Sequence, residues 1–253
     1  MNSLNLFKEN LFSYALMLGS KSGGGKLVAP SGSVACISGL PYATENYLVL
    51  EPSDTPFDAL RLISFLKASG LPFVAPVLPG IQQKLLSALD ESQILPVLTF
   101  TAMSIDLSGA SKPGAESALL RVTGEDLADT WGRVVWDGFD SGGAVTKEYL
   151  SLARHMANLP ENRLYLFCEE DTPVSSAMLH FTERSCGLYY FSTIAGFRRR
   201  GYAKRLMQAL ADEAAREYGE LVLLATPEGL PFYRSFGFRT LAEISMRSNS
   251  RVL

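Results

Sequence analysis

The chain has 253 residues and a formal net charge of -3, with 47% hydrophobic and 19% charged residues. These values are typical of a soluble globular protein large enough to bury one big core or two smaller ones, and they exclude a general basic excess of the kind that attracts nucleic acids. The three cysteines are widely spaced and odd in number, so we expect neither a disulfide framework nor a zinc site.

The start of the chain, residues 1–26, contains a short apolar patch without a basic leader or a small-residue cleavage site. No later stretch approaches the roughly 18 uninterrupted apolar residues that a membrane-spanning helix needs. We therefore expect a cytoplasmic protein without a signal peptide and with neither membrane nor nucleic acid as its partner. The oligomeric state is left open.

The N-terminal half alternates between strand-like and helix-like segments. Short runs of aliphatic residues predict strands, and apolar residues at helical spacing predict helices. In chain order we expect a strand at 46–52, a helix at 55–70, a strand at 72–78, a helix at 80–92 and a strand at 95–107. This half therefore has the succession β-α-β-α-β.

The clearest break in the chain is the segment SGASKPGAES, residues 108–117. It is small and polar, and a proline with nearby glycines favours a turn or a linker there. We place the boundary between two lobes in this segment, so that the lobes comprise residues 1–112 and 113–253.

The C-terminal half begins with a short strand and two helices, followed by three strands joined by tight turns, which predicts an antiparallel meander. A helix, a strand, a short helix and a last strand come after the meander. The expected strands are 118–123, 163–170, 174–183, 187–195, 220–227 and 238–247, and the expected helices are 124–139, 146–159, 202–219 and 228–237.

A basic turn, GFRRRGYAKRLM, joins the third meander strand to the next helix. A strand that runs through a glycine turn into a helix leaves the first N–H groups of the helix without partners, and these attract anions. Gly201 lets a bulky ligand approach the backbone, Ala203 keeps the next turn narrow, and cationic side chains surround the turn. A pyrophosphate is the natural ligand; a solvated basic face at a helix start is the alternative.

The pattern Arg198-x-x-Gly201-x-Ala203 resembles the Q/R-x-x-G-x-G/A turn of the GNAT superfamily, the N-acyltransferases that use acetyl-CoA. Downstream, Tyr233 followed four residues later by Gly237 and Phe238 is similar to a second element of that family. The resemblance covers about residues 117–247. It implies an α/β protein with the GNAT (acyl-CoA N-acyltransferase) fold, a mixed and mostly antiparallel sheet flanked by helices.

The resemblance also implies roles for individual residues. Backbone groups of Phe191 and Thr193 would bind the pantetheine arm of acetyl-CoA and polarise the thioester, and Tyr233 would protonate the departing thiolate. The pyrophosphate of the cosubstrate would lie on the basic turn, and no metal is implied. The cofactor-binding residues of the turn would be Arg198, Arg199, Arg200, Gly201, Tyr202, Ala203 and Lys204.

A general base for the amine cannot be assigned from the sequence. Some GNAT enzymes use a glutamate four residues before the Phe191 position, where this chain has Gly187. His180 is expected to be a packed or edge histidine of its strand. The carboxylates that could substitute by type alone are Glu169, Glu170, Glu183 and Glu228.

The first lobe repeats the strand and helix succession of residues 188–247, which suggests two GNAT-like lobes in tandem. Its turn, EPSDTPFDA, has no glycine, and its acidic residues Glu51, Asp54 and Asp58 would face the incoming phosphates. We therefore expect a degenerate lobe at 1–112 and an acetyl-CoA-binding GNAT domain at 113–253. An unrelated α/β lobe is the alternative.

The expected function is an acetyl-CoA-dependent N-acetyltransferase that moves an acetyl group directly to a small-molecule or peptide amine. Its partners would be acetyl-CoA and the acceptor amine. A non-catalytic acyl-CoA-binding or sensing module is the alternative, since the family glutamate is missing. The acceptor and the acyl chain length cannot be read from the sequence.

Overall fold

The computed structural model describes residues 2–109 and 119–251. The chain forms two compact units. Unit 1 contains residues 1–10, 103–223 and 232–239, and unit 2 contains residues 11–102, 224–231 and 240–253. Each unit thus includes segments from both halves of the chain. The expected boundary between residues 112 and 113 lies outside the described residues and stays a prediction.

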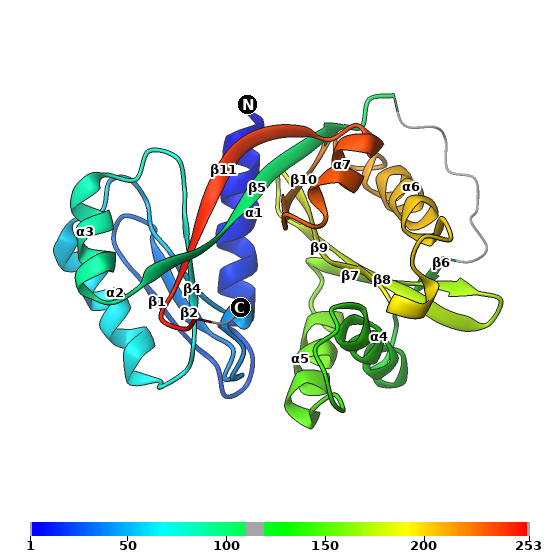
Figure 1. Cartoon of the computed structure of the whole chain (residues 1–253), viewed down its shortest axis with the longest axis horizontal. Coiled ribbons are helices and arrows are strands. Elements are labelled where there is room, and N and C mark those ends of the chain that lie inside the picture. The colour runs from blue at the N-terminus through cyan, green and yellow to red at the C-terminus, as the bar shows by residue number, and fades with distance from the viewer. Residues whose placement is uncertain (1, 110–118, 252–253) are drawn as a thin grey trace. The chain divides into compact units, whose positions relative to one another are not determined.

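Unit 2 is built on three antiparallel strands followed by a parallel one (Figure 1). Within this unit the strand order is β1-β2-β3-β4-β11-β5, and β11 is antiparallel to β4. The elements are β1 (Gly25–Val28), β2 (Val34–Ile37), the short helix η1 (Ala43–Glu45), β3 (Asn46–Val49), α2 (Pro56–Ala68), β4 (Val74–Val77), α3 (Gln83–Glu91), β5 (Leu95–Asp106) and β11 (Arg239–Ser248).

The core of unit 2 is apolar side chains of α2 and α3 against the sheet. Leu62 and Leu66 lie one helical turn apart on α2, so both point to the same side, and they pack with Phe73 and Leu85. Thr55 caps α2 by accepting a hydrogen bond from the Asp58 amide at 3.1 Å. Burial of one helical face therefore fixes α2 on the sheet.

Unit 1 is built on an antiparallel meander, with β10 parallel to β9. Within this unit the strand order is β5-β10-β9-β8-β7-β6. Figure 1 shows α6 on one face of the meander and α4 and α5 on the other. The elements that lie wholly or partly in this unit are α1 (Ser3–Leu18), which continues into unit 2 from Leu11, β6 (Leu119–Arg121), α4 (Glu125–Gly138), α5 (Lys147–Ala157), β7 (Asn162–Glu169), β8 (Thr172–Phe181), β9 (Cys186–Thr193), η2 (Ala195–Phe197), α6 (Tyr202–Ala214), β10 (Glu220–Ala225) and α7 (Leu230–Phe236).

The two halves of the chain repeat one order of elements: three antiparallel strands, a helix, a strand parallel to the last of the three, a second helix and a final strand. The final strands, however, are exchanged. In unit 1 the strand beside β10 is β5, which closes the first repeat, and in unit 2 the strand beside β4 is β11, which closes the second. The repeat in the sequence is therefore confirmed, and each unit contains one strand from the other repeat.

The helices and strands expected between residues 46 and 107 and between 119 and 247 are all present. Among the described residues, five elements were not predicted, namely α1, β1, β2 and the short helices η1 and η2. Part of the expected linker, residues 110–117, lies outside the described residues. In the described part of the chain, no helix combines the length and the apolar character needed to cross a bilayer.

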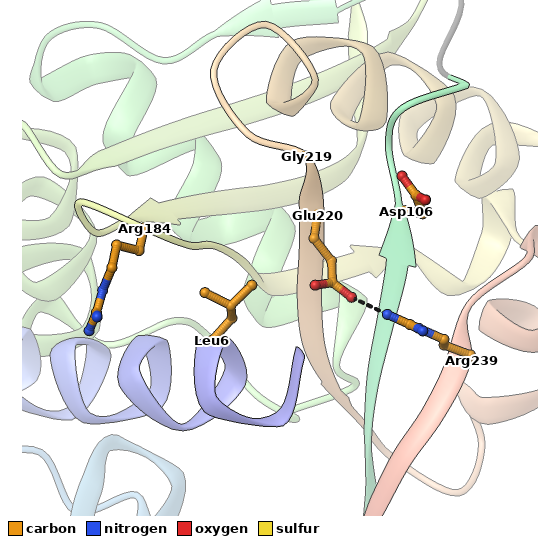
Figure 2. A pocket seen from close by; sticks show the side chains of 6 residues that line it. All are labelled: Leu6, Asp106, Arg184, Gly219, Glu220 and Arg239. Carbon is orange, nitrogen blue, oxygen red and sulfur yellow. Dashed lines mark hydrogen bonds and ion pairs between the residues drawn. The ribbon is translucent and has the colours of Figure 1, made fainter. Parts of the chain in front are cut away.

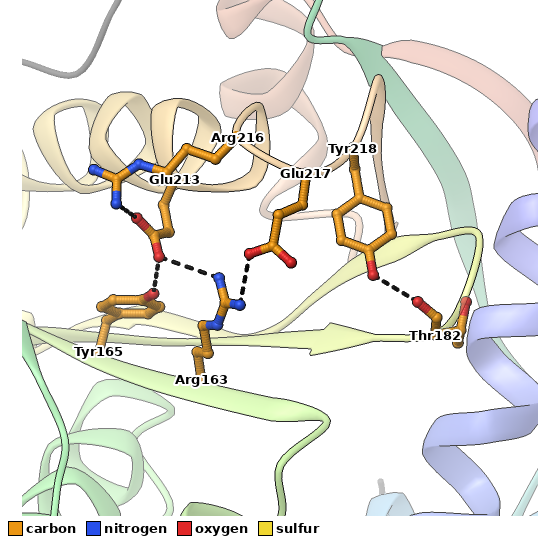
Figure 3. A network of polar contacts seen from close by, with 7 residues as sticks. All are labelled: Arg163, Tyr165, Thr182, Glu213, Arg216, Glu217 and Tyr218. Carbon is orange, nitrogen blue, oxygen red and sulfur yellow. Dashed lines mark hydrogen bonds and ion pairs between the residues drawn. The ribbon is translucent and has the colours of Figure 1, made fainter.

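A polar network fixes the C-terminal end of α6 to the meander (Figure 3). Arg163 of β7 bonds Glu213 at 3.2 Å and Glu217 at 2.6 Å. The hydroxyl group of Tyr165 donates to Glu213 at 3.1 Å, and Arg216 pairs with the same carboxylate at 2.9 Å. These bonds attach the C-terminal end of α6 to β7.

Candidate active site

A bulge in β9 sets the backbone geometry of the candidate site. Ser176 of β8 is opposite Ser192, but the next paired residues are Met178 and Tyr189. Two residues of β9, Tyr190 and Phe191, therefore face the single residue Ala177. Tyr190 has a φ of 50°, which is uncommon for a residue other than glycine.

The Phe191 N–H group points away from the Ser176 hydroxyl. The carbonyl oxygen of Tyr190 accepts a hydrogen bond from the Ser176 hydroxyl on β8 at 3.1 Å, and in a trans peptide the N–H group points opposite to the C=O group. On the other side, β10 continues only two residues beyond the paired Leu223, whereas β9 continues five beyond Leu188. The end of β9, including Phe191 and Thr193, thus extends past the end of β10.

The turn after β9 presents a run of backbone N–H groups. Arg199 and Gly201 have φ values of 65° and 87°, and α6 begins at Tyr202 without a side-chain cap. The first helical bond runs from the Arg205 amide to the Gly201 carbonyl. Among the described residues, the amides of residues 199 to 204 have no hydrogen-bond acceptor. Such a concave run of amides can bind an anion.

The side chain of Arg198 is directed to the end of α4. Its Nη2 donates to the Gly138 carbonyl at 2.7 Å and to Asp140 at 2.9 Å, while its Nε donates to the Thr193 carbonyl at 2.9 Å. Arg198 therefore fixes the turn against β9 and α4. Arg199, Arg200 and Lys204 are exposed beside it.

Tyr202 and Arg200 both contact Glu169 at the end of β7. The Tyr202 hydroxyl donates to Glu169, and the pKa of Tyr202 is raised mainly by this hydrogen bond. Arg200 lies 4.0 Å from the same carboxylate, with its guanidinium over the Phe197 ring. Ala203 follows in α6 and is half-buried. An acidic side chain thus lies against the basic turn.

Tyr233 lies on α7 in an aromatic cluster with the bulge. Its ring is 6.0 Å from Phe191, 5.5 Å from Phe232 and 5.6 Å from Phe238. Burial raises the pKa of Tyr233, so its phenol is protonated at neutral pH. The structure therefore brings Tyr233 and Phe191 together, as a shared site requires.

The space beside Gly187, where some GNAT enzymes have a glutamate, is occupied by a side chain of α1, a helix that the sequence did not predict. A Cβ atom on Gly187 would meet Asn10 Oδ1 of α1 at 1.9 Å, and the Tyr189 hydroxyl donates to this oxygen at 2.9 Å. His180 is buried, bonded through Nδ1 to Asn162 at 2.7 Å, and burial lowers its pKa to about 4. It is a packed histidine, as expected.

The turn of the first repeat differs from its expected form. Asp54 is fully buried and accepts hydrogen bonds from the hydroxyls of Ser31 and Ser33. Asp58 bonds Thr55 at 2.7 Å in a reciprocal cap of α2. Asp54 therefore does not face a ligand as expected, because its carboxylate is buried against two serine hydroxyls, whereas the expectation for the half-buried Asp58 stays a prediction.

Two surface hollows of about 310 Å³ each lie in unit 1. One is lined by Trp136, Asp137 and the loop after α4. The other lies at the start of β10, away from the bulge, and Arg239 bonds Glu220 there at 2.8 Å (Figure 2). Burial acts to raise the pKa of Glu220, but hydrogen bonds, including this one, lower it overall. The second hollow is lined by Leu6, Asp106, Arg184, Gly219, Glu220 and Arg239.

Sequence reasoning missed the residues that support the bulge. Trp131 of α4 donates its indole N–H to the Ala177 carbonyl at 3.0 Å, and its ring meets Tyr190 edge-on at 5.2 Å. Ser176 and Asn10 were missed as well. A buried serine or asparagine gives no local pattern, because its partner is chosen by the fold.

Comparison with known proteins supports one family. Residues 138–252 match the family model described as an acetyltransferase (GNAT) domain. A comparison with curated proteins gives no match.

Several solved structures are similar over most of the chain. A GCN5-related N-acetyltransferase from Kribbella flavida has a TM-score of 0.65 at 14% identity, covering 94% of this chain and 93% of that one. A functionally unknown conserved protein from Staphylococcus epidermidis has a TM-score of 0.62 at 14% identity, covering 89% and 93%. A tandem GNAT protein from the clavulanic acid biosynthesis pathway has a TM-score of 0.59 at 10% identity, covering 96% and 94%.

At these identities the structural likeness shows the fold alone. The family model shows in addition which domain family residues 138–252 match. The chain therefore has the GNAT fold in a two-lobed form, and its residues 138–252 belong to the acetyltransferase (GNAT) domain family.

Proposed function

We propose that the protein is an acetyl-CoA-dependent N-acetyltransferase that acts on a small-molecule or peptide amine in the cytoplasm. The observation that carries this proposal is the run of amides at residues 199 to 204, which have no acceptor in the described chain and lie between the bulged strand and α6, after the short helix η2. A Cβ atom on Gly201 would have no heavy atom within 4 Å, so this backbone is open to a ligand. The pyrophosphate of acetyl-CoA fits such a site.

The positive charge for the phosphates would come from Arg199, Arg200 and Lys204. Arg198 would act mainly through its backbone and by holding the turn, because protein groups already accept from its guanidinium. Tyr202 and Ala203 would contribute the first helical amides. Charge-assisted hydrogen bonds of about 1.5–3 kcal/mol each would supply most of the phosphate binding.

In the reaction, the amine nitrogen attacks the thioester carbonyl carbon, the new C–N bond forms and the C–S bond breaks. The Phe191 N–H group would stabilise the oxyanion, and the Thr193 backbone would bind the pantetheine arm. Tyr233 would give its phenolic proton to the departing thiolate, and the proton that the amine releases through water would restore it. We assign no general base.

Calorimetry with acetyl-CoA tests the binding site. The variant Arg199→Glu/Arg200→Glu should lose at least tenfold in affinity, because two cations become anions beside the phosphates. The variant Lys67→Glu/Lys84→Glu has the same change in net charge at exposed helix residues of unit 2 and should bind as the wild type does. Unchanged affinity in Arg199→Glu/Arg200→Glu would show that the basic turn does not bind acetyl-CoA.

A non-catalytic acyl-CoA-binding module is the second candidate, favoured by Asn10 at the position of the family glutamate. Release of free thiol from acetyl-CoA in the presence of a panel of amines separates the two. An enzyme should lose about 100-fold in turnover in Tyr233→Phe while keeping its affinity for acetyl-CoA. A binding module would release no thiol above the uncatalysed rate with any amine.

A further inference from the structure

The hydroxyl group of Ser176 is connected to the peptide that carries the proposed oxyanion donor. Ser176 is fully buried on β8, and its Oγ donates to the Tyr190 carbonyl at 3.1 Å. Since this bond uses its only hydrogen, the 2.8 Å contact with Ser192 must be a bond that the Ser192 hydroxyl donates. The two hydroxyls thus form a chain that ends on the Tyr190 carbonyl.

The Tyr190 carbonyl that accepts this bond belongs to the bulge. A bulge interrupts the regular ladder, and Tyr190 itself has a φ of 50°. The Tyr190–Phe191 peptide is planar, so a bond that fixes the direction of its C=O group also fixes the direction of its N–H group. Ser176 therefore controls where the Phe191 N–H group points.

The other end of the chain of hydroxyls is equally constrained. A Cβ atom on Gly138 would come within 2.1 Å of Ser192 Oγ, so α4 packs directly on this hydroxyl group. The Gly138 carbonyl accepts from Arg198, which holds the basic turn. Neighbouring groups leave Ser192 little freedom to turn away from Ser176.

We infer that Ser176 is a positioning residue of the transferase reaction, which sets the Phe191 N–H group toward the thioester oxygen. This inference rests on the proposed function. It assigns no contact between Ser176 and the substrate. The preceding residue, Ser175, is equally buried but bonds the Thr193 side chain at 2.8 Å, so it does not fix this peptide.

Threonine and valine at residue 176 have nearly the same shape and differ by the hydroxyl group. In Ser176→Val we expect kcat to fall about tenfold, less than the 100- to 1000-fold loss that follows removal of an oxyanion donor, with KM for acetyl-CoA unchanged. Ser176→Thr should restore most of the rate, and Ser175→Ala should keep the wild-type rate. A rate loss in Ser176→Thr equal to that in Ser176→Val would contradict the inference.

Two spectroscopic readouts separate this inference from the proposed function. In the protein without ligand, the amide resonance of Phe191 should shift in Ser176→Val and stay in place in Ser175→Ala; an unshifted resonance overturns the role of Ser176. With carbon-13-labelled acetyl-CoA bound, the thioester carbonyl band should lie at lower frequency in the wild type than in Ser176→Val. Absence of acetyl-CoA binding by the wild type overturns the proposed function, while the Phe191 resonance still decides the direction of the peptide.

Discussion

Asn10 and Gly187 share one space: a Cβ atom at residue 187 would lie 1.9 Å from Asn10 Oδ1. Asn10 is fully buried and donates through Nδ2 to the His180 carbonyl at 3.0 Å and to Ser185 at 3.1 Å. A side chain on β9 at this position is therefore replaced by one from α1. The position where some GNAT enzymes have a glutamate holds a carboxamide here.

Gly187→Ala should lower the free energy of unfolding by about 1–3 kcal/mol, because the added methyl group overlaps the Asn10 carboxamide. Urea unfolding followed by circular dichroism measures this. In an Asn10→Ala background the same substitution should cost less, since the overlapping oxygen is gone. An equal loss of stability in both backgrounds would show that the overlap with the Asn10 carboxamide is not the cause of the loss.

Gly201→Ala should weaken acetyl-CoA binding about tenfold or more, because its Cβ atom enters the open side of the turn. Alanine at a positive φ also costs about 1–2 kcal/mol of stability. Gly70→Ala is the matched control, since Gly70 has a φ of 71° and equally open surroundings. Calorimetry should show full affinity in Gly70→Ala and a similar loss of thermal stability in both variants; equal affinities would contradict a ligand on the turn.

Glu169→Gln should bind acetyl-CoA about two- to fivefold more tightly, the range expected for release of one exposed ion pair. The substitution removes a negative charge that lies 4.0 Å from Arg200, so this arginine becomes available to the phosphates. Glu170→Gln is the control on the same hairpin, at an exposed residue. Weaker binding by Glu169→Gln would mean that Glu169 orients Arg200 and does not compete with the ligand.

His180 should make the protein sensitive to mild acid. Its pKa is about 4 in the folded protein and about 6.5 in an unfolded chain. Between these pH values the imidazole is protonated in the unfolded state and neutral in the folded state. This contribution to stability is complete above pH 6.5 and is lost as the pH falls toward 4, by roughly 2 kcal/mol at pH 5. Proton NMR of the imidazole should show no titration near pH 6.5, and His180→Gln should have a flatter pH dependence of unfolding than His155→Gln.

A fragment of residues 113–253 should not fold as a stable unit. Unit 1 contains the last residues of β5 and the first turns of α1, and these supply the strand beside β10 and the buried Asn10. The fragment should give poorly dispersed amide NMR spectra, whereas the full chain gives dispersed ones. Mixing it with residues 1–112 should restore dispersion; a well-folded fragment alone would show that the exchanged strand is dispensable.

The sequence predicts the order of helices and strands along the chain well, but it does not predict which distant residues and strands contact one another. The basic turn is readable because a glycine, a small residue and several cations occur at fixed spacing before a helical pattern, and α6 indeed begins at Tyr202. Tyr233 is recognisable by its distance from Gly237. Its catalytic role and the binding roles of the turn residues stay predictions.

The missed features depend on contacts between distant residues. Asn10 bonds a residue 170 positions away, and as a polar residue it interrupts the apolar pattern that would have marked α1. The strand β1 (GKLV) contains only two aliphatic residues, so it does not stand out from the glycine-rich segment before it. Nothing local in the sequence of β5 specifies its neighbours, so its place beside β10 could not be chosen from the sequence.

The exchange of β5 and β11 has a consequence for synthesis on the ribosome. Unit 2 needs β11, which is translated only after residues 103–223 of unit 1, although most of unit 2 is made before them. Until β11 has emerged from the ribosome, the edge of β4 that pairs with it is open. During this interval the growing chain exposes an unpaired strand edge that chaperones or other chains can bind.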